Sequence, residues 1–182
     1  MKATGIVRRV DELGRLVIPK EIRRTLRIRE GDPLEIFTDR EGEIILKKYS
    51  PVGELGIFAK QYAESLAQTT GHMVCVTDRD QIVAVAGASK KELMSKPISR
   101  MLEKVIDSRE NILATSTDKN FVSISNDDDL DVKSQVIAPI ICEGDAIGSV
   151  IMMTKENAVK FGETEKKLCF SAAGFLGKQM EN

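Results

Sequence analysis

The chain has 182 residues, of which 42% are hydrophobic and 30% charged, and its formal net charge is −1. This composition is typical of a soluble globular protein of one or two domains. No stretch approaches the roughly 18 consecutive apolar residues that span a bilayer, and the N-terminus lacks the apolar core of a signal peptide. We therefore expect a cytoplasmic protein without a membrane partner.

The N-terminal part of the chain alternates short β-prone runs with turn signals. Two such runs within 6–18 flank a loop and predict a β-hairpin. Pro19 ends the second run and suits the first position of a short helix, which is expected over 20–26. Runs at 34–38 and 43–47 predict a second hairpin. We therefore expect a β-rich unit with one short helix.

Basic side chains gather in the same part of the chain. Nine lysines and arginines but only three acidic residues lie between Met1 and Arg29, so this segment carries +6 and the remainder −7. A guanidinium group can hold a phosphate, or the edge of a guanine, with two parallel hydrogen bonds. Clustered basic residues are the electrostatic footprint of nucleic-acid binding, and a merely solvated basic surface is the alternative.

Three motifs make the interpretation of this segment more specific. They are Gly5-Ile6-Val7-Arg8, then Asp11-Glu12-Leu13-Gly14-Arg15-Leu16-Val17-Ile18-Pro19, then Glu21-Ile22-Arg23-Arg24-Thr25-Leu26. With them, residues 1–50 resemble the DNA-binding domain of the AbrB-like transition-state regulators. The resemblance implies a swapped-hairpin barrel in which two chains exchange strands, and thus a homodimer. It also implies that double-stranded DNA is contacted by Arg8, Arg15, Arg23 and Arg24, with Arg9 and Lys20 as further candidates by proximity.

The small size of this unit and of its helix has two further consequences. A unit of about fifty residues buries too little apolar surface to be stable alone, which agrees with a dimer. A helix as short as 20–26 cannot lie along a major groove with several base-reading side chains. We therefore expect phosphate contacts to dominate affinity, DNA shape to contribute specificity, and binding to weaken steeply with salt.

A domain boundary is expected near Ser50 and Pro51, which suit the start of a helix. We divide the chain into a DNA-binding domain at 1–50, a linker at 51–55 that runs into a helix, and a second domain at 56–182. Apolar residues at three- and four-residue spacing predict that this helix extends to Thr70.

The second domain is expected to be of the α+β class. Hairpins are predicted within 72–86 and 134–153. Helices are predicted at 91–109, interrupted by Pro97, and at 162–180. Strands flanked by terminal helices favour an antiparallel sheet. The polar segment 111–133 is expected to be a mobile loop.

The same region resembles a GAF domain over residues 56–179. The resemblance rests on Ala138-Pro139-Ile140, Gly144 and Ile147-Gly148-Ser149-Val150, followed by a terminal helix with Ala172 and Ala173. It implies an unidentified small-molecule effector in a cavity between the sheet and the middle helices, while no cofactor is indicated.

The two resemblances together are typical of a family of transcription regulators that act late in spore development. They imply a nucleoid-associated homotetramer that activates some promoters and represses others. Its dimers would be joined through the GAF-like domains and through helices such as 51–70 and 163–180.

The sequence does not predict an enzyme or a metal site. His72 is the single histidine, so no catalytic triad or histidine metal set can be built. The acidic run 127–131 is superficially similar to a calcium loop but lacks its glycine and its bidentate acid. An antitoxin-type DNA-binding autoregulator without ligand sensing is the alternative function, because swapped-hairpin domains also occur in toxin–antitoxin pairs.

The three cysteines are expected to be buried, reduced thiols. Cys75, Cys142 and Cys169 lie far apart in apolar stretches and form no C-x-x-C motif. A redox-sensing role for one of them is the alternative.

Overall fold

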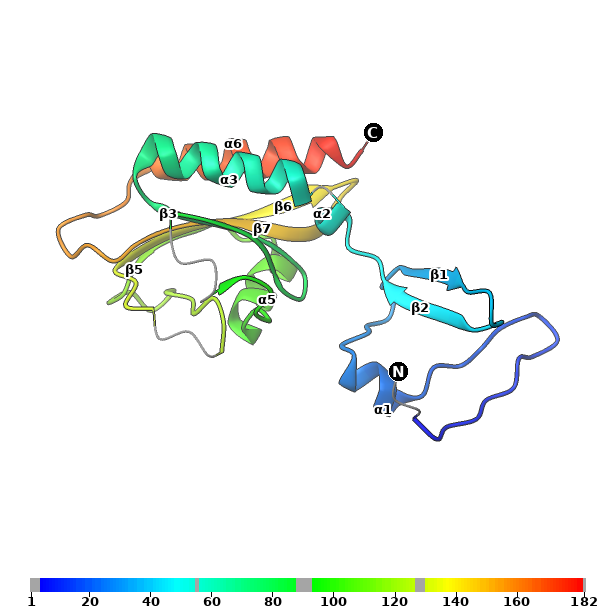
Figure 1. Ribbon diagram of the computed structural model, residues 1–182. Helices are drawn as coiled ribbons and strands as arrows, with labels where there is room; N and C mark the ends of the chain where they lie inside the picture. Colours follow the sequence, from blue (N-terminus) through cyan, green and yellow to red (C-terminus); the bar gives the residue numbers. More distant parts are fainter. Residues whose placement is uncertain (1–3, 55, 88–92, 127–129, 182) are drawn as a thin grey trace. The chain divides into compact units, whose positions relative to one another are not determined.

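The computed structural model describes residues 4–54, 56–87, 93–126 and 130–181. Contacts within the chain divide it into two compact units, Met1–Tyr49 and Ser50–Asn182, hereafter the N-terminal and C-terminal units (Figure 1). None of the helices that the structure describes is long and apolar enough to cross a bilayer.

The N-terminal unit contains a short helix and one hairpin. Helix α1 spans Lys20–Thr25, and strands β1 (Leu34–Thr38) and β2 (Ile44–Lys48) pair antiparallel. The turn between the strands is closed by Asp39, whose Oδ1 accepts hydrogen bonds from the backbone N–H groups of Glu41 (3.0 Å) and Glu43 (2.9 Å). The predicted short helix and second hairpin are thus confirmed.

The predicted first hairpin, within 6–18, is wrong for the single chain. Residues 4–10 and 15–19 form no strand, and they flank a turn in which the Gly14 N–H donates to the Asp11 carbonyl (3.0 Å) and the Asp11 N–H donates to the Arg15 carbonyl (3.0 Å). The apolar side chains of these runs have no surface to cover, since Val7 is 85% exposed. A two-stranded hairpin without a packed face is at best marginally stable in water, which explains why no strand forms here.

The C-terminal unit is built on a five-stranded antiparallel sheet with the strand order β4-β3-β7-β6-β5. The strands are β3 (Met73–Asp78), β4 (Ile82–Ala86), β5 (Ile112–Thr115), β6 (Ser134–Cys142) and β7 (Asp145–Thr154). The two hairpins expected from the sequence, β3–β4 and β6–β7, are confirmed, as is the α+β class with an antiparallel sheet.

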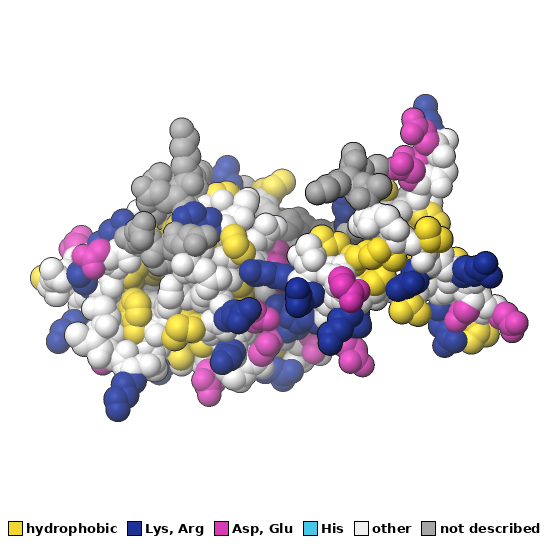
Figure 2. All heavy atoms as spheres, turned by 90° about the horizontal axis from the view of Figure 1, so that it is seen from below, with side chains coloured by type: hydrophobic (Ala, Val, Ile, Leu, Met, Phe, Trp, Pro, Cys, Tyr) yellow, Lys and Arg dark blue, Asp and Glu magenta, His cyan; other side chains and the backbone are white. Residues whose placement is uncertain are grey.

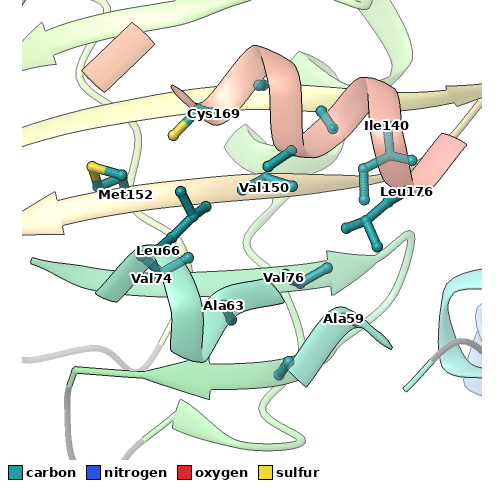
Figure 3. Close-up of a cluster of buried hydrophobic side chains, with 14 of the residues drawn as sticks. Ala59, Ala63, Leu66, Val74, Val76, Ile140, Val150, Met152, Cys169 and Leu176 are labelled. Atoms are coloured by element: carbon teal, nitrogen blue, oxygen red, sulfur yellow. The ribbon is translucent and has the colours of Figure 1, made fainter. Parts of the chain in front are cut away.

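Two long helices cover one face of this sheet (Figure 1). Helix α2 (Pro51–Glu54) leads into α3 (Gly56–Thr70), and α6 (Glu163–Gln179) lies beside α3. The core beneath them combines small residues of α3 with larger side chains of the strands (Figure 3). It includes Ala59, Ala63, Leu66, Val74, Val76, Ile140, Val150, Met152, Cys169 and Leu176.

Small residues also let α6 approach the sheet closely. Gly177 packs directly on β6, because a Cβ at this position would lie 2.1 Å from the carbonyl oxygen of Ile141. Helix α6 begins after Gly162, whose backbone N–H donates to the Glu165 carboxylate at 2.7 Å. The predicted terminal helix is confirmed.

The other face of the sheet carries α5 (Arg100–Ser108). This helix is shorter than the helix predicted at 91–109, because Ser99 starts it as the N-cap, its Oγ accepting from the Leu102 N–H at 3.0 Å. Leu93 is still helical, but residues 94–95 form a turn, Pro97 bridges to Gln81 after the β3–β4 turn, and Ile98 bridges to Ser125. Residues 88–92, where the helix was expected to begin, lie outside the described part of the chain.

The expectation of a mobile loop over 111–133 is also corrected. Strand β5 occupies Ile112–Thr115 at the edge of the sheet, and Val122 and Ile124 are buried. The Gln135 side-chain amide lies against the backbone of Val122, and in the amide orientation that satisfies both groups it donates to the Val122 carbonyl (3.0 Å) and accepts from the Val122 N–H (2.6 Å). The segment is therefore anchored on the sheet. The acidic run at 127–129 lies outside the described residues.

Candidate nucleic-acid interface

The turn at 11–14 is shaped by one carboxylate. Oδ1 of Asp11 accepts from the backbone N–H groups of Leu13 (3.0 Å) and Arg15 (2.8 Å), and Oδ2 lies 2.7 Å from the Arg15 Nε. The backbone N–H and then the guanidinium of Arg15 lower the pKa of Asp11 below its ordinary value. An ionised Asp11 thus orients the Arg15 side chain, most of which is exposed to solvent.

The remaining predicted contacts on this segment are exposed. Arg8 and Arg9 lie on the extended run before the turn, and neither forms an ion pair with the residues that the structure describes. Within the described residues, the hydrogen bonds of 4–18 all stay inside this segment. A single chain therefore does not fix Arg8 and Arg15 relative to α1.

Helix α1 carries the other candidate residues. Pro19 precedes it as the N-cap, one position earlier than the sequence pattern predicts, and its carbonyl accepts from the Arg23 N–H at 3.0 Å. Lys20, Arg23 and Arg24 are all exposed on this helix. The two arginines lie in its last turn, where the negative end of the helix dipole favours cations.

A lysine joins the end of α1 to strand β2. Nζ of Lys48 lies 3.1 Å from the Asp32 carboxylate and donates to the Arg27 carbonyl at 2.9 Å, while the same carboxylate accepts from the Arg29 N–H at 2.8 Å. Burial raises the pKa of Asp32, but these donors and Lys48 outweigh it and hold the pKa below its usual value. No sequence pattern indicated this network, although Asp32 lies in the Gly31-Asp32-Pro33 turn signal.

The N-terminal unit also exposes a large amount of apolar surface. On the face seen in Figure 2, hydrophobic side chains lie among lysines and arginines. The exposed set includes Val7, Val10, Leu13, Leu16, Val17, Leu26, Ile36, Ile44 and Leu46. The exposure of so many large apolar side chains on a unit of this size favours an interaction surface.

In the C-terminal unit, the layer between the sheet and α5 is predominantly apolar, with buried side chains such as Ile98, Leu102 and Ile151. Two buried polar side chains of the unit, Ser99 and Gln135, have hydrogen-bond partners. Among the described residues no three His, Cys, Asp or Glu side chains are grouped so that they could hold a metal ion.

The thiols are free, and their burial differs from the expectation at one position. Cys75 and Cys169 are buried as predicted, whereas Cys142 is half-buried. Burial raises the pKa of Cys169 to about 12, and burial together with nearby carboxylates also raises the pKa of Cys142. Both thiols are therefore protonated at neutral pH.

Two family models match the chain. The model described as stage V sporulation protein T C-terminal, transcription factor, covers residues 54–181. The model described as antidote-toxin recognition MazE, bacterial antitoxin, covers residues 7–54.

Individual proteins are similar to the whole chain or to one unit. The chain is 56% identical to stage V sporulation protein T of Bacillus subtilis over 181 residues, which cover 100% of this chain and 99% of that protein. Over 51 residues it is 71% identical to the transition state regulatory protein AbrB of B. subtilis, covering 28% of this chain and 52% of that protein. These matches confirm the AbrB-like N-terminal domain.

A solved structure supports the fold of the C-terminal unit. The GAF domain of the phosphoenolpyruvate-protein phosphotransferase from Acinetobacter superposes with a TM-score of 0.58 at 12% identity, covering 69% of this chain and 81% of that one. At this identity the likeness shows the GAF fold alone.

Proposed function

The chain belongs to the family of stage V sporulation protein T, a family of transcription factors, and from this premise we propose that it binds double-stranded DNA through its N-terminal unit. The proposed contacts are Arg8, Arg15, Arg23 and Arg24, with Arg9 and Lys20 beside them. The observation that carries the proposal is that these side chains are exposed on a loop and on a short helix. Of the six, only Arg15 forms an ion pair within the described part of the chain.

In this proposal the binding unit is a homodimer. Segment 4–18 has no hydrogen bond to the rest of the described chain, and its apolar side chains are exposed. Strands exchanged with a second copy would pair this backbone and bury those side chains. The same exchange would fix Arg8 and Arg15 relative to Arg23 and Arg24, which one chain leaves unfixed.

We assign the units separate roles, with DNA binding at 1–50, a linker at 51–55, and a sensing and assembly domain at 56–182. The outer side of α3 and α6 exposes Ile57, Phe58 and Phe175, and Phe175 stacks on Tyr62 with 5.2 Å between ring centroids. This surface would join two dimers into a homotetramer. Light scattering on a Phe58→Ser variant tests the assignment, since it should convert a tetramer into a dimer.

The GAF fold supports a regulatory role for the C-terminal unit. A small-molecule effector held between the sheet and α5 would change the arrangement of the terminal helices, and through them DNA binding. This requires that the effector prefer one arrangement, because equal affinity for both shifts nothing. Unchanged DNA affinity after deletion of 51–182, and after addition of cell extract, would make this unit a scaffold.

In this proposal the protein acts at the nucleoid in the cytoplasm and catalyses no reaction. It activates some sporulation promoters and represses others. The antitoxin-type autoregulator is the second candidate, since the MazE model matches residues 7–54. It is disfavoured by the transcription-factor model over 54–181 and by the full-length relative. Co-purification of a toxin with the native protein would reverse this choice.

A salt series tests DNA binding directly. Up to about eight phosphate contacts in a dimer would give a slope of log affinity against log salt on the order of −7. Replacing Arg23 and Arg24 by Ala removes four of them and should make the slope shallower by about 3.6. The matched control replaces Arg100 and Lys104, two exposed cations of α5, and removes the same charge from the other unit. No binding at low salt, or identical slopes for all three proteins, would refute the proposal.

A further inference from the structure

The backbone just after α1 contains an arginine in a conformation that arginine disfavours. Arg27 has φ +53°, in the left-handed region. Glycine is the usual residue in that region, because a Cβ there crowds the following carbonyl oxygen. A strained residue persists only where its surroundings hold it in place, and such residues gather at functional sites.

The surroundings of Arg27 are a complete helix-ending motif. The Ile28 N–H donates to the Arg23 carbonyl (2.7 Å), and the Arg27 N–H donates to the Arg24 carbonyl (3.4 Å). This is the Schellman pattern, whose left-handed position is most often glycine. Lys48 further holds the Arg27 carbonyl at 2.9 Å. The backbone at this position is therefore fixed, and glycine would satisfy it with less strain.

The Arg27 side chain does nothing visible for the fold. It is exposed, and its guanidinium forms no hydrogen bond or ion pair with the residues that the structure describes. Arg29, two residues further on, is by contrast half-buried and its backbone N–H is bonded to Asp32. Arg27 instead lies just past the end of α1, three and four residues after Arg24 and Arg23, so it adds a third exposed cation to this end of the helix.

The left-handed backbone alone does not indicate a ligand. Arg109 has φ +58° at the end of α5, in the C-terminal unit, and serves as the C-cap there. What distinguishes Arg27 is its place beside Arg23 and Arg24. Attraction to the helix dipole is the competing explanation for a cation after a helix, and it applies equally to Arg109.

We infer that Arg27 is a further DNA contact, which places its guanidinium on a phosphate next to those held by Arg23 and Arg24. The inference rests on the proposed DNA-binding function and extends it. Arginine is retained at a glycine position because the charge is needed for binding. Removing it should therefore weaken DNA binding while leaving the fold intact or more stable.

The test uses full-length protein and a fluorescent random-sequence DNA duplex across about 50 to 200 mM salt. The variants are Arg27→Gly and Arg27→Asn, because both glycine and asparagine tolerate the left-handed conformation. The matched control is Arg109→Gly, which makes the same substitution in the same backbone conformation but in the other unit. Thermal unfolding midpoints are measured alongside.

Two lost contacts per dimer should make the salt slope shallower by about 1.8, so the loss of affinity over this salt range should shrink by about tenfold. Both Arg27 variants should show this with an unchanged or raised unfolding midpoint, and Arg109→Gly should bind like the wild-type protein.

Three outcomes would overturn the inference. Wild-type slopes for both Arg27 variants would overturn it alone, with DNA binding by Arg23 and Arg24 left standing. Weaker binding together with lower unfolding midpoints in both variants would assign Arg27 to the fold. Failure of the wild-type protein to bind at low salt would overturn the proposed function as well.

Discussion

Replacing Gly177 by alanine should destabilise the protein, whereas the same change at Gly174 in the same helix should stabilise it. A Cβ at Gly177 would lie 2.1 Å from the carbonyl oxygen of Ile141, and Cβ atoms do not approach closer than 3.0 Å. Helix α6 and strand β6 must therefore separate by about 0.9 Å. A Cβ at Gly174 meets nothing within 4 Å.

The size of the effect follows from two opposing contributions. Alanine in place of glycine inside a helix stabilises by about 0.5–1 kcal/mol, and both variants receive this. Displacing packed layers costs about 1–3 kcal/mol, and only Gly177→Ala incurs it. The two variants should differ by ~2 kcal/mol in the free energy of unfolding, which corresponds to about 4–8 °C in the midpoint for a chain of this size.

Thermal unfolding followed by circular dichroism measures this difference, with both variants at the same protein concentration. Gly174→Ala is the control, because it changes the same residue type on the same helix. If Gly177→Ala unfolds at or above the temperature of Gly174→Ala, the close contact between α6 and β6 does not exist in solution.

Three further predictions concern single side chains. Because the pKa of Asp32 lies below its usual 3.8, its ion pair with Lys48 stabilises the protein above that pH and is lost as the pH falls through the lowered value. The free energy of unfolding of Asp32→Asn should thus be lower than that of the wild type by about 1–2 kcal/mol at neutral pH, and this difference should disappear in acid. A difference that does not depend on pH would contradict this. Cys142 should react with a thiol reagent in the folded protein, faster at higher pH, whereas Cys169 should react only on unfolding, which mass spectrometry of the labelled protein can show. Asp78→Asn should lower the unfolding midpoint, because an amide has one acceptor oxygen fewer than the buried carboxylate that accepts from Ser50 Oγ at 2.7 Å. The expected loss in the free energy of unfolding is about 1–3 kcal/mol. An unchanged midpoint would show that this carboxylate does not hold the start of the C-terminal unit in place.

Periodicity and turn residues were sufficient to predict the elements that are stable through contacts within the chain. The hairpins β1–β2, β3–β4 and β6–β7 and the helices α3 and α6 follow from apolar spacing bounded by turns. Strand β5 was missed because it has only four residues within a polar segment, and its pairing with β6 decides its conformation.

Other features depend on information that a local pattern does not contain. The first predicted hairpin has strand-like residues, but its partner surface is absent from the single chain, so pattern and structure differ there. The candidate arginines followed from motif and charge. The Lys48 network did not, because it joins residues up to 21 positions apart, and the left-handed backbone of Arg27 did not, because arginine is not a residue type that usually marks such a position.

The unpaired segment 4–18 has a consequence for the synthesis of the protein. It is translated before the C-terminal unit, whose roughly 130 residues come later in the chain. At ~5–20 residues per second, their translation takes roughly 7–26 s. During this time side chains such as Val7, Val10 and Val17 stay exposed, since the described part of their own chain does not bury them.

Three arginines, Arg8, Arg9 and Arg15, interrupt this apolar segment, and flanking charges of this kind oppose the stacking of β-prone runs on one another. The same guanidinium groups that are proposed to hold DNA would thus also oppose the association of nascent chains. Substituting them by neutral residues would lower solubility during expression as well as DNA affinity.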